Sequence, residues 1–456
     1  MSDKFGRFQQ KMQQAGLSAT VITAFKYYYD KLTAGERGLL TREMITRPDE
    51  NRIIDYNELG SGITAPLEEL AVIKLNGGLG TSMGLDSAKS LLTIKNGQTF
   101  LDIIARQILH YRQVEKKQIP LLFMNSFNTS EDTLAFLRKY PELKLAGLPL
   151  DFLQNKFPKV EAESLLPYTA ADDLLTWNPP GHGEIYMVLQ QSGVLDVLLE
   201  KGYRYIFISN SDNLGAVVDT RILDLMANQK IPFIMEVCHR TEMDKKGGHL
   251  AGDAAGKLLL RESAQCPTEE ISQFQDVEYY RYFNTNNLWV DLTALQEKLH
   301  VNDNFLQLTP IMNRKTVNGT DIYQLESAMG AAINVFDEAR AVVVNRQRFV
   351  PVKKTNEFLA VLSDAYELND SWKLHLAEGR DKAPQISLEE KYYGKINDFE
   401  ERLKGGLPSL RNCESLNLTG NIFFGDNIII NGNVTLSASG EKYLENRTFS
   451  DGEYKL

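Results

Sequence analysis

The chain has 456 residues, a formal net charge of −10 at pH 7, 43% hydrophobic residues and 24% charged residues. This length suits two or three domains, and the composition is that of a globular protein with a sizeable core. The excess of acidic residues argues against a general binder of nucleic acid or of anionic membranes, so we expect neither among its partners.

The cysteines indicate a reducing compartment. Cys238, Cys266 and Cys413 are far apart and form no CxxC pair, which excludes a disulfide scaffold and a thiolate zinc site. The first residues show no apolar targeting segment, and no run approaches the ~18 apolar residues of a membrane span. We therefore expect a cytoplasmic protein.

Residues 1–45 are expected to form a helical arm. Phe8, Met12, Val21 and Phe25 recur at helix-like spacing among polar residues. The segment carries no chemical motif, so packing is its expected role.

Between about residues 70 and 350, short apolar runs alternate with helical stretches. Strands are expected at 70–75, 120–125, 204–210, 232–237 and 287–292, and helices at 100–118 and 184–202. Strands that are buried on both faces read as near-continuous apolar runs, and these do. The sequence therefore predicts an α/β fold with a mostly parallel sheet and helices on both sides.

A glycine-rich loop follows the first of these strands, in AVIKLNGGLGTSMGLDSAKS at 71–90. A Walker-type loop would need glycine at Ala88, and the dinucleotide fingerprint would need it at Met83. Glycines still let backbone N–H groups approach an anion closely, so a third type of phosphate loop is expected. A tight turn without ligand is the alternative, and it accounts for two glycines better than for four.

A polar run, 210–213, follows the strand expected at 204–210. In open parallel sheets, ligands bind beyond the carboxyl ends of the strands. The glycine loop and this run are therefore expected to face one crevice.

The end of the chain has a different period. Leu416, Ile422, Ile428 and Val434 recur every six residues, and an asparagine precedes each of the last three. This repeat is typical of a parallel β-helix, with an ordinary β-meander as the alternative.

Several motifs occur together and in order, over roughly residues 5–440, and together they resemble the eukaryotic-type UTP–glucose-1-phosphate uridylyltransferase (UDP-glucose pyrophosphorylase) family. They are KLNGGLGTSMG with its downstream lysine, FLQNK, NPPGHGEIY, SNSDNLGA, KGG, FNTNNLW and RFVPVKKT. A single glycine loop would be weak evidence, whereas the ordered set is specific.

The resemblance implies a Rossmann-like, GT-A-like nucleotidyltransferase domain at 46–350, preceded by the arm at 1–45. Linker helices at 351–400 and a left-handed β-helix at 401–456 would follow. The implied reaction joins UTP and glucose 1-phosphate to give UDP-glucose and diphosphate, with Mg²⁺ as cofactor. Because the attacking phosphate oxygen is already ionised, this reaction needs orientation and charge neutralisation more than an acid or a base.

The resemblance also implies catalytic residues. Lys89 and Lys353 would place positive charge on the phosphates, and Asp212 would bind Mg²⁺, a hard ion that takes one or two carboxylates plus phosphate oxygens. Lys354 is the adjacent residue, and the match to the PVK motif assigns the role to Lys353. For isolated residues, a solvated lysine and an Asx cap are the ordinary alternatives. The family usually has Gly-Pro before the first lysine, where this chain has Ser87-Ala88, which puts the stiffness of the loop in doubt.

The remaining residues are implied to bind substrate. Asn284 and Asn286 alternate on an extended segment, so both would face one side and bind sugar hydroxyls, together with Glu262. Gln154 would read the edge of uracil, and His182 would lie near the sugar phosphate. The others, which surround the nucleotide or the sugar side of the product, are Leu75, Asn76, Gly77, Gly78, Gly181, Asn210 and Ser211.

Two other functions stay open at this point. The chain could be a relative that acts on UDP-N-acetylhexosamine or on several UDP-sugars, and its activity on a panel of sugar 1-phosphates would distinguish this specificity from one for glucose. An inactive nucleotide-sugar-binding scaffold is the other, although the presence of Lys89, Asp212 and Lys353 argues against it. A β-helix at the C-terminus could form a homo-oligomer or pack on its own catalytic domain.

Overall fold

The computed structural model describes residues 4–456, so residues 1–3 of the expected arm lie outside the described residues. The arm consists of α1 (Lys4–Gln14) and α2 (Ala19–Thr33), and the Ser18 side chain caps α2 by accepting from the N–H of Val21. Its apolar face packs on Phe157 and Trp177 of the neighbouring part of the chain. The predicted helices are confirmed up to Thr33, whereas residues 34–45, also expected to be helical, form turns and irregular structure.

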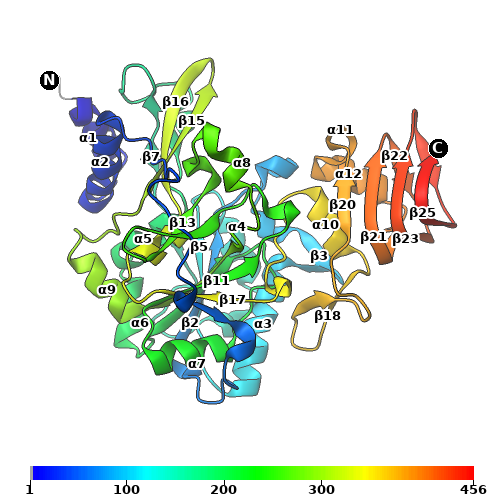
Figure 1. Cartoon of the computed structure of the whole chain (residues 1–456), viewed down its shortest axis with the longest axis horizontal. Helices are drawn as coiled ribbons and strands as arrows, with labels where there is room; N and C mark the ends of the chain where they lie inside the picture. Colours follow the sequence, from blue (N-terminus) through cyan, green and yellow to red (C-terminus); the bar gives the residue numbers. More distant parts are fainter. Residues whose placement is uncertain (1–3) are drawn as a thin grey trace.

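A ten-stranded sheet forms the centre of the molecule (Figure 1). Its main path runs β1 (Ile53–Asp55), β17 (Arg340–Val343), β11 (Phe233–His239), β14 (Tyr282–Asp291), β10 (Tyr205–Asn210), β2 (Leu70–Asn76), β5 (Leu121–Asn125) and β6 (Asp151–Leu153). On this path only β14 runs antiparallel to its neighbours. The hairpin of β12 (His249–Gly252) and β13 (Leu258–Arg261) pairs with β14. The predicted mostly parallel sheet is confirmed.

Helices cover both faces of this sheet. Along β2, Leu70 and Val72 pack in one core with α3 (Phe100–Glu115) and α7 (Thr220–Gln229). Ala71 and Ile73 point into the opposite core, which contains α5 (Ile185–Gln191), α6 (Val194–Glu200) and α9 (Leu292–His300). Burial on both faces is the physical reason why the strand reads as a continuous apolar run.

The single helix expected at 184–202 is wrong in one respect, because it is divided into α5 and α6. Gly193 between them has φ +72°, a left-handed conformation that ends an α-helix and that glycine adopts at little cost. The hydroxyl of Ser192 donates to the carbonyl of Val188 at 2.7 Å at the same break.

Shorter elements surround the sheet. They are β3 (Thr93–Lys95), β4 (Gln98–Thr99), α4 (Ser130–Leu137), β7 (Phe157–Pro158), β8 (Val160–Glu161), β9 (Trp177–Asn178), α8 (Ile271–Phe274), β15 (Pro310–Val317) and β16 (Thr320–Ser327).

The C-terminal part lies at the end of the molecule opposite the arm (Figure 1). Its elements are α10 (Thr355–Leu362), β18 (Tyr366–Leu368), β19 (Leu374–Leu376), β20 (Gln385–Leu388), α11 (Glu390–Tyr393), α12 (Ile396–Leu403), β21 (Ser409–Thr419), β22 (Ile422–Phe424), β23 (Ile428–Ser437), β24 (Lys442–Leu444) and β25 (Arg447–Lys455).

The strands of this part stack in parallel. β20, β21, β23 and β25 form one sheet, and β22 pairs with β24 in another. Leu416 is paired with Val434, and both side chains are buried. The six-residue period therefore marks parallel coils as predicted, and the β-meander is wrong because its strands would be antiparallel. The handedness and the four domain boundaries stay predictions, although β20, within 351–400, already pairs with β21.

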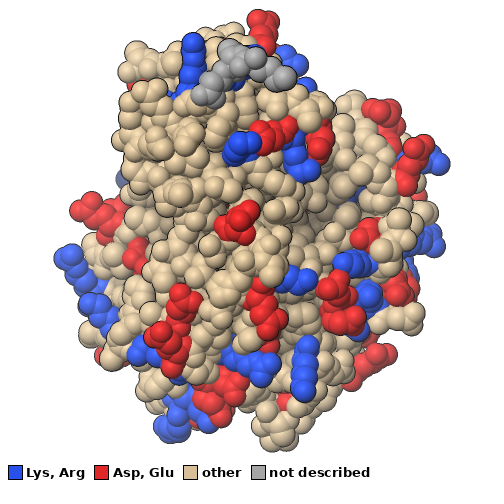
Figure 2. Space-filling model, turned by 90° about the vertical axis from the view of Figure 1, so that its left-hand side faces the viewer, with Lys and Arg blue, Asp and Glu red and all other residues tan. Residues whose placement is uncertain are grey.

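The face that carries the N-terminal arm shows acidic and basic side chains interspersed, without a continuous basic patch among the residues coloured in Figure 2. Within residues 4–456, no helix is both long enough and apolar enough to cross a bilayer.

Candidate active site

The glycine loop and the polar run after β10 open at the same edge of the sheet. β2 and β10 are adjacent and parallel, with Leu75 opposite Asn210. Beyond these strand ends, the Lys89 ammonium lies 2.8 Å from Oδ2 of Asp212. The two segments therefore lie side by side at the carboxyl edge of the sheet, where the crevice is expected.

The glycine loop folds back on itself. Gly80 and Gly84, with φ +67° and +75°, flank a 3₁₀ turn, and the N–H of Lys89 donates to the carbonyl of Gly78 at 3.3 Å. A Cβ on Gly80 would come within 2.7 Å of Leu85 Cδ1. The side chain of Ala88, where the family usually has proline, is buried. Backbone conformation and packing thus hold Lys89 at the mouth of the loop.

The side chain of Asn76 forms hydrogen bonds with three neighbouring segments of the chain. Its Nδ2 donates to Asn125 Oδ1 at 2.8 Å and to Thr133 Oγ1 at 2.9 Å, and its Oδ1 accepts from the hydroxyl of Ser211 at 2.8 Å. Both Asn76 and Ser211 are buried. These side chains support the crevice wall, so any contact with substrate through their backbone stays a prediction.

Gln154 lies over the glycine loop. A Cβ on Gly77 would be 3.0 Å from its Nε2 and 3.2 Å from its Oε1, so any larger residue there would push this amide aside by a few tenths of an ångström. The next residue, Asn155, donates to the carboxylate of Glu184 through its N–H at 2.9 Å and through Nδ2 at 2.6 Å. Burial raises the pKa of Glu184 to about 7. The Gln154 loop is thereby held against the start of α5.

Gly181 and His182 pack against the segment after β16. Gly181 has φ +81°, and a Cβ there would lie 2.3 Å from the carbonyl oxygen of Ser327. The N–H of Met329 donates to His182 Nδ1 at 2.9 Å. Burial, helped by the positive charge of Lys353, lowers the pKa of His182 to about 4. The imidazole is therefore neutral near pH 7, and its proton is on Nε2.

The residues predicted to bind the sugar lie together. Asn284 Nδ2 donates to Asn286 Oδ1 at 2.8 Å, and the N–H of Asn286 donates to Asn284 Oδ1 at 2.9 Å. Burial raises the pKa of Glu262, while the charge of Lys353 and a hydrogen bond from Asn284 act in the opposite direction.

The expectation that simple alternation puts both asparagines on one side of the strand is wrong, however. Simple alternation along β14 is interrupted by a bulge opposite Glu236 and Val237, where Asn286 has φ +59°. The bulge turns Asn286 back toward Asn284, which is a common use of bulges beside functional sites.

The two neighbouring lysines after β17 have different surroundings. Lys353 interacts electrostatically with His182 and with Glu262. The ammonium of Lys354 lies 3.9 Å from Glu390 of α11. The structure thus brings Lys353, and not Lys354, to the predicted sugar-phosphate residues.

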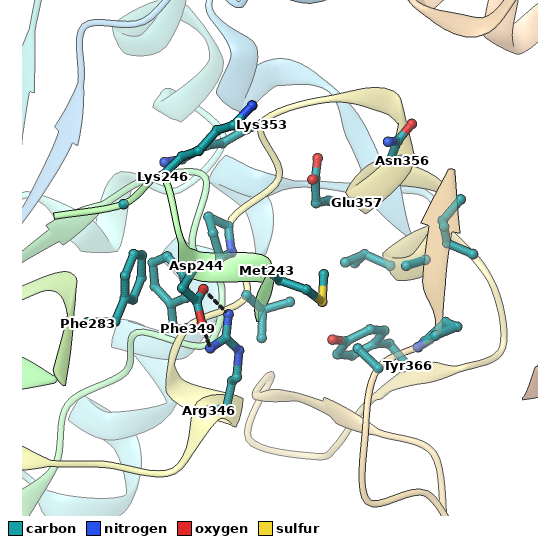
Figure 3. Close-up of a pocket in the computed structure, with 18 residues that line it drawn as sticks. Met243, Asp244, Lys246, Phe283, Arg346, Phe349, Lys353, Asn356, Glu357 and Tyr366 are labelled. Atoms are coloured by element: carbon teal, nitrogen blue, oxygen red, sulfur yellow. Dashed lines mark hydrogen bonds and ion pairs between the residues drawn. The ribbon is translucent and has the colours of Figure 1, made fainter. Parts of the chain in front are cut away.

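Lys353 also lines a cavity of about 390 Å³ between the sheet and the C-terminal part. Figure 3 shows Lys246 and Lys353 at one end of it, opposite Glu357, with the Asp244–Arg346 ion pair below them. Lys246 belongs to the KGG motif but was given no role in the prediction. The KGG motif is the only sequence feature that points to Lys246, and its position beside Lys353 depends on the fold.

Asp212 suits a divalent cation. Its Oδ2 accepts from Lys89, whereas its Oδ1 is buried and accepts no hydrogen bond from any described residue. Residues 4–456 contain no group of three or more His, Cys, Asp and Glu side chains that could enclose a metal ion. A single carboxylate beside a phosphate loop suits Mg²⁺, which takes its other ligands from phosphates and water.

The sequence matches a known family along most of its length. The family model described as UTP–glucose-1-phosphate uridylyltransferase matches residues 22–431. The enzyme of that name from Solanum tuberosum is 39% identical over 90% of this chain and 87% of its own length. The one from Encephalitozoon cuniculi is 38% identical over 88% of this chain and 82% of its own.

Solved structures agree with the sequence matches. The UDP-glucose pyrophosphorylase of Leishmania major, known in open and closed structures, covers all of both chains with a TM-score of 0.94 and 38% identity. A variant of it in complex with UDP-glucose gives a TM-score of 0.93 over all of both chains at 38% identity. The UDP-glucose phosphorylase of Trypanosoma brucei is 43% identical, with a TM-score of 0.88 and full coverage of both chains.

An α/β sheet with a glycine loop, a lysine and an aspartate at its carboxyl edge suits a nucleotidyltransferase, and the comparisons show that class. The chain belongs to the UTP–glucose-1-phosphate uridylyltransferase family, whose activity joins UTP and glucose 1-phosphate. The family, activity and fold class expected from the sequence are confirmed.

Proposed function

We propose that this chain transfers the uridylyl group in the crevice between the glycine loop and residues 210–213, by in-line attack of the sugar phosphate on the α-phosphorus of UTP. The observation that carries this proposal is the Lys89–Asp212 pair at the loop's mouth. The Lys89 ammonium can bind phosphate, and the Oδ1 of Asp212 is buried and accepts no hydrogen bond from the residues that the structure describes. The crevice thus offers charge of both signs for a metal-assisted phosphate reaction.

In this proposal, the reacting phosphate lies between two lysines. Lys89 neutralises charge from the glycine-loop side, and Lys353 does so from the side of His182 and Glu262. His182 donates a hydrogen bond from its Nε2–H to the sugar phosphate and stays neutral, with no proton transferred. Mg²⁺, when bound to Asp212, would supply further positive charge to the phosphates.

Substrate recognition is divided among three groups of residues. Leu75, Asn76, Gly77 and Gly78 wrap the nucleotide, and Gln154 reads the edge of uracil, with Gly181 beside the base. Asn210, Ser211, Glu262, Asn284 and Asn286 contact the sugar side. The substrates and products are UTP, glucose 1-phosphate, UDP-glucose and diphosphate, and the UDP-glucose complex of the Leishmania major variant supports this set.

We extend the proposal to organisation and location. The proposal keeps the four predicted ranges, a helical arm at 1–45, a catalytic domain at 46–350, linker helices at 351–400 and a left-handed β-helix at 401–456, and the three free cysteines are compatible with a cytoplasmic location. β25 is an edge strand of the C-terminal sheet and could pair with a second copy of the chain. Light scattering at two protein concentrations tests this homo-oligomer.

A coupled assay of diphosphate release tests the proposed function. With UTP, Mg²⁺ and a panel of sugar 1-phosphates, glucose 1-phosphate should give the highest kcat/KM, and chelation of the metal should abolish the rate. No release with any sugar would support an inactive scaffold. A preference for N-acetylhexosamine 1-phosphate would support the relative with another specificity.

A further inference from the structure

Asn213, next to the predicted metal ligand, has every polar position of its side chain occupied. Its Nδ2 donates to the carbonyl of Arg348 at 3.1 Å and to Asn287 Oδ1 at 3.3 Å. Its Oδ1 accepts from the N–H of Gly215 at 3.2 Å and from the N–H of Val350 at 2.9 Å. The side chain is buried, with 2% of its surface exposed, so it faces protein and not the crevice.

The backbone continues this contact toward Lys353. Asn213 forms an isolated antiparallel bridge with Pro351, and the N–H of Val352 donates to the carbonyl of Asp212 at 3.1 Å. Lys353 is the next residue. The Lys353 segment is thus paired directly with the loop that carries Asp212.

A buried ion pair anchors the other end of the same segment. Arg348 donates to both carboxylate oxygens of Glu236, through Nε at 2.7 Å and Nη2 at 2.6 Å. Asn287 Nδ2 donates to Glu236 Oε2 at 3.0 Å and to the carbonyl of Arg348 at 3.2 Å. All of these side chains are buried. Asn213 therefore lies between a rigid buried network and the segment that ends in Lys353.

We infer that Asn213 is a positioning residue that holds the Lys353 ammonium at a set distance from Asp212 and Lys89, and that Asn287 supports it. Asn213 contacts no substrate in this account and acts only through Lys353. The inference therefore rests on the proposed role of Lys353 in the reaction.

The physical effect of losing Asn213 follows from this arrangement. Without its amide, the Val350 N–H loses its partner and the Arg348 carbonyl keeps only the hydrogen bond from Asn287, so the Lys353 segment is held less firmly relative to Asp212. A displacement of ~1 Å in a reacting arrangement can reduce the rate by about a hundredfold. We expect Asn213→Ala to lower kcat at least about tenfold and to leave KM for UTP within about threefold, because the nucleotide contacts are elsewhere.

A double-mutant cycle tests whether Asn213 acts through Lys353. kcat is measured for the wild type, Asn213→Ala, Lys353→Ala and the double variant. If Asn213 positions Lys353, then Asn213→Ala should cost less than about twofold in the Lys353→Ala background. A loss of the same factor in both backgrounds overturns the inference while the role of Lys353 stands. A Lys353→Ala enzyme with normal kcat would instead overturn the proposed function, and the inference with it.

Asn334→Ala is the matched control, because Asn334 Nδ2 also bridges two groups, Asp253 Oδ2 at 2.9 Å and the carbonyl of Leu258 at 3.3 Å. It should keep normal kcat. An equal loss in this control would mean general loosening and would overturn the inference. If Asn213→Ala does not fold, the same cycle with Asn287→Ala decides, because this change removes a hydrogen bond to Asn213 and leaves the Val350 bond intact.

Discussion

The ammonium of Lys89 and the carboxylate of Asp212 lie 2.8 Å apart, although 123 residues separate them in the sequence. Asp212 follows the end of β10, and Lys89 lies at the far end of the loop that leaves the adjacent parallel strand β2, so the sheet topology and the fold of this loop together create the pair. Both side chains are mostly shielded from solvent, with 12% and 20% exposed. The pair therefore brings opposite charges to the place where a triphosphate and a divalent cation would meet.

The first prediction concerns Asp212 as the metal ligand. Asp212→Ala should lower kcat by at least about a hundredfold, because the phosphate charge loses its metal-assisted neutralisation. Steady-state kinetics across a Mg²⁺ titration measures this, and the circular dichroism spectrum should be unchanged. Lys89→Ala serves as the comparison, since it should lower kcat without a comparable shift in the Mg²⁺ requirement. A near-normal rate for Asp212→Ala at an ordinary Mg²⁺ concentration would contradict the role of Asp212 as the metal ligand.

Gln154 supports a prediction about base selection. Its amide stands over Gly77, and no hydrogen bond joins its side chain to the described part of the protein, so both of its polar atoms are free to read a base. Gln154→Ala should reduce the preference for UTP over CTP, measured as a ratio of kcat/KM, by about tenfold, the scale of one or two lost hydrogen bonds. Gln229→Ala, an exposed change at the end of α7, is the control. An unchanged ratio in Gln154→Ala would show that another residue reads the base.

His182 supports a prediction about pH. Its pKa is about 4 in the fold against an ordinary 6.5, so between these values the unfolded chain binds more protons than the folded one. Its contribution to the free energy of unfolding is therefore complete above about pH 6.5 and is lost as the pH falls toward 4. The loss should amount to about 3 kcal/mol.

Urea unfolding of the wild type and of His182→Gln at several pH values isolates this contribution. The difference between the two proteins should shrink on acidification, whereas the exposed His300→Gln should show no such trend. Nitrogen-15 NMR should find the proton on Nε2 at pH 7, because Nδ1 accepts from Met329. A proton on Nδ1 would contradict this orientation.

The sequence predicts what depends on local pattern. The sheet strands were predictable because their apolar runs are buried on both faces, and the C-terminal coils because their six-residue period repeats in the structure. The break at Gly193 was missed because one glycine inside an apolar helical pattern does not reveal its backbone angle. The bulge at Asn286 is not predictable from the strand's own sequence, which indicates regular alternation of side chains, because the bulge arises in the pairing with the neighbouring strand β11.

Contacts between distant parts of the chain limited prediction of the site. The structure places the Lys89 ammonium beside Asp212 and joins Val352, the neighbour of Lys353, to the Asp212 carbonyl, whereas the roles of the three residues stay predictions. Asn213 belongs to the polar run 210–213, but its positioning role is not visible in the sequence, because its partners are 135 residues away at Arg348 and 74 away at Asn287. Lys246 was visible in a motif, but only the fold brings it to the cavity lined by Lys353.

Two lysines are proposed to act on the reacting phosphate from opposite sides. Steady-state kinetics of Lys353→Ala beside Lys354→Ala tests it most directly, because these neighbours differ mainly in direction: one faces His182 and Glu262, the other Glu390. Lys353→Arg should restore little activity, since a planar guanidinium does not replace a compact ammonium.

We predict that Lys353→Ala lowers kcat by at least about a hundredfold, the value of one well-placed charge in a transition state, as Lys89→Ala also should. Lys354→Ala should stay within about twofold of the wild type, because its exposed contact with Glu390 contributes little. If Lys354→Ala proves the damaging change and Lys353→Ala the mild one, the assignment of the second lysine is contradicted.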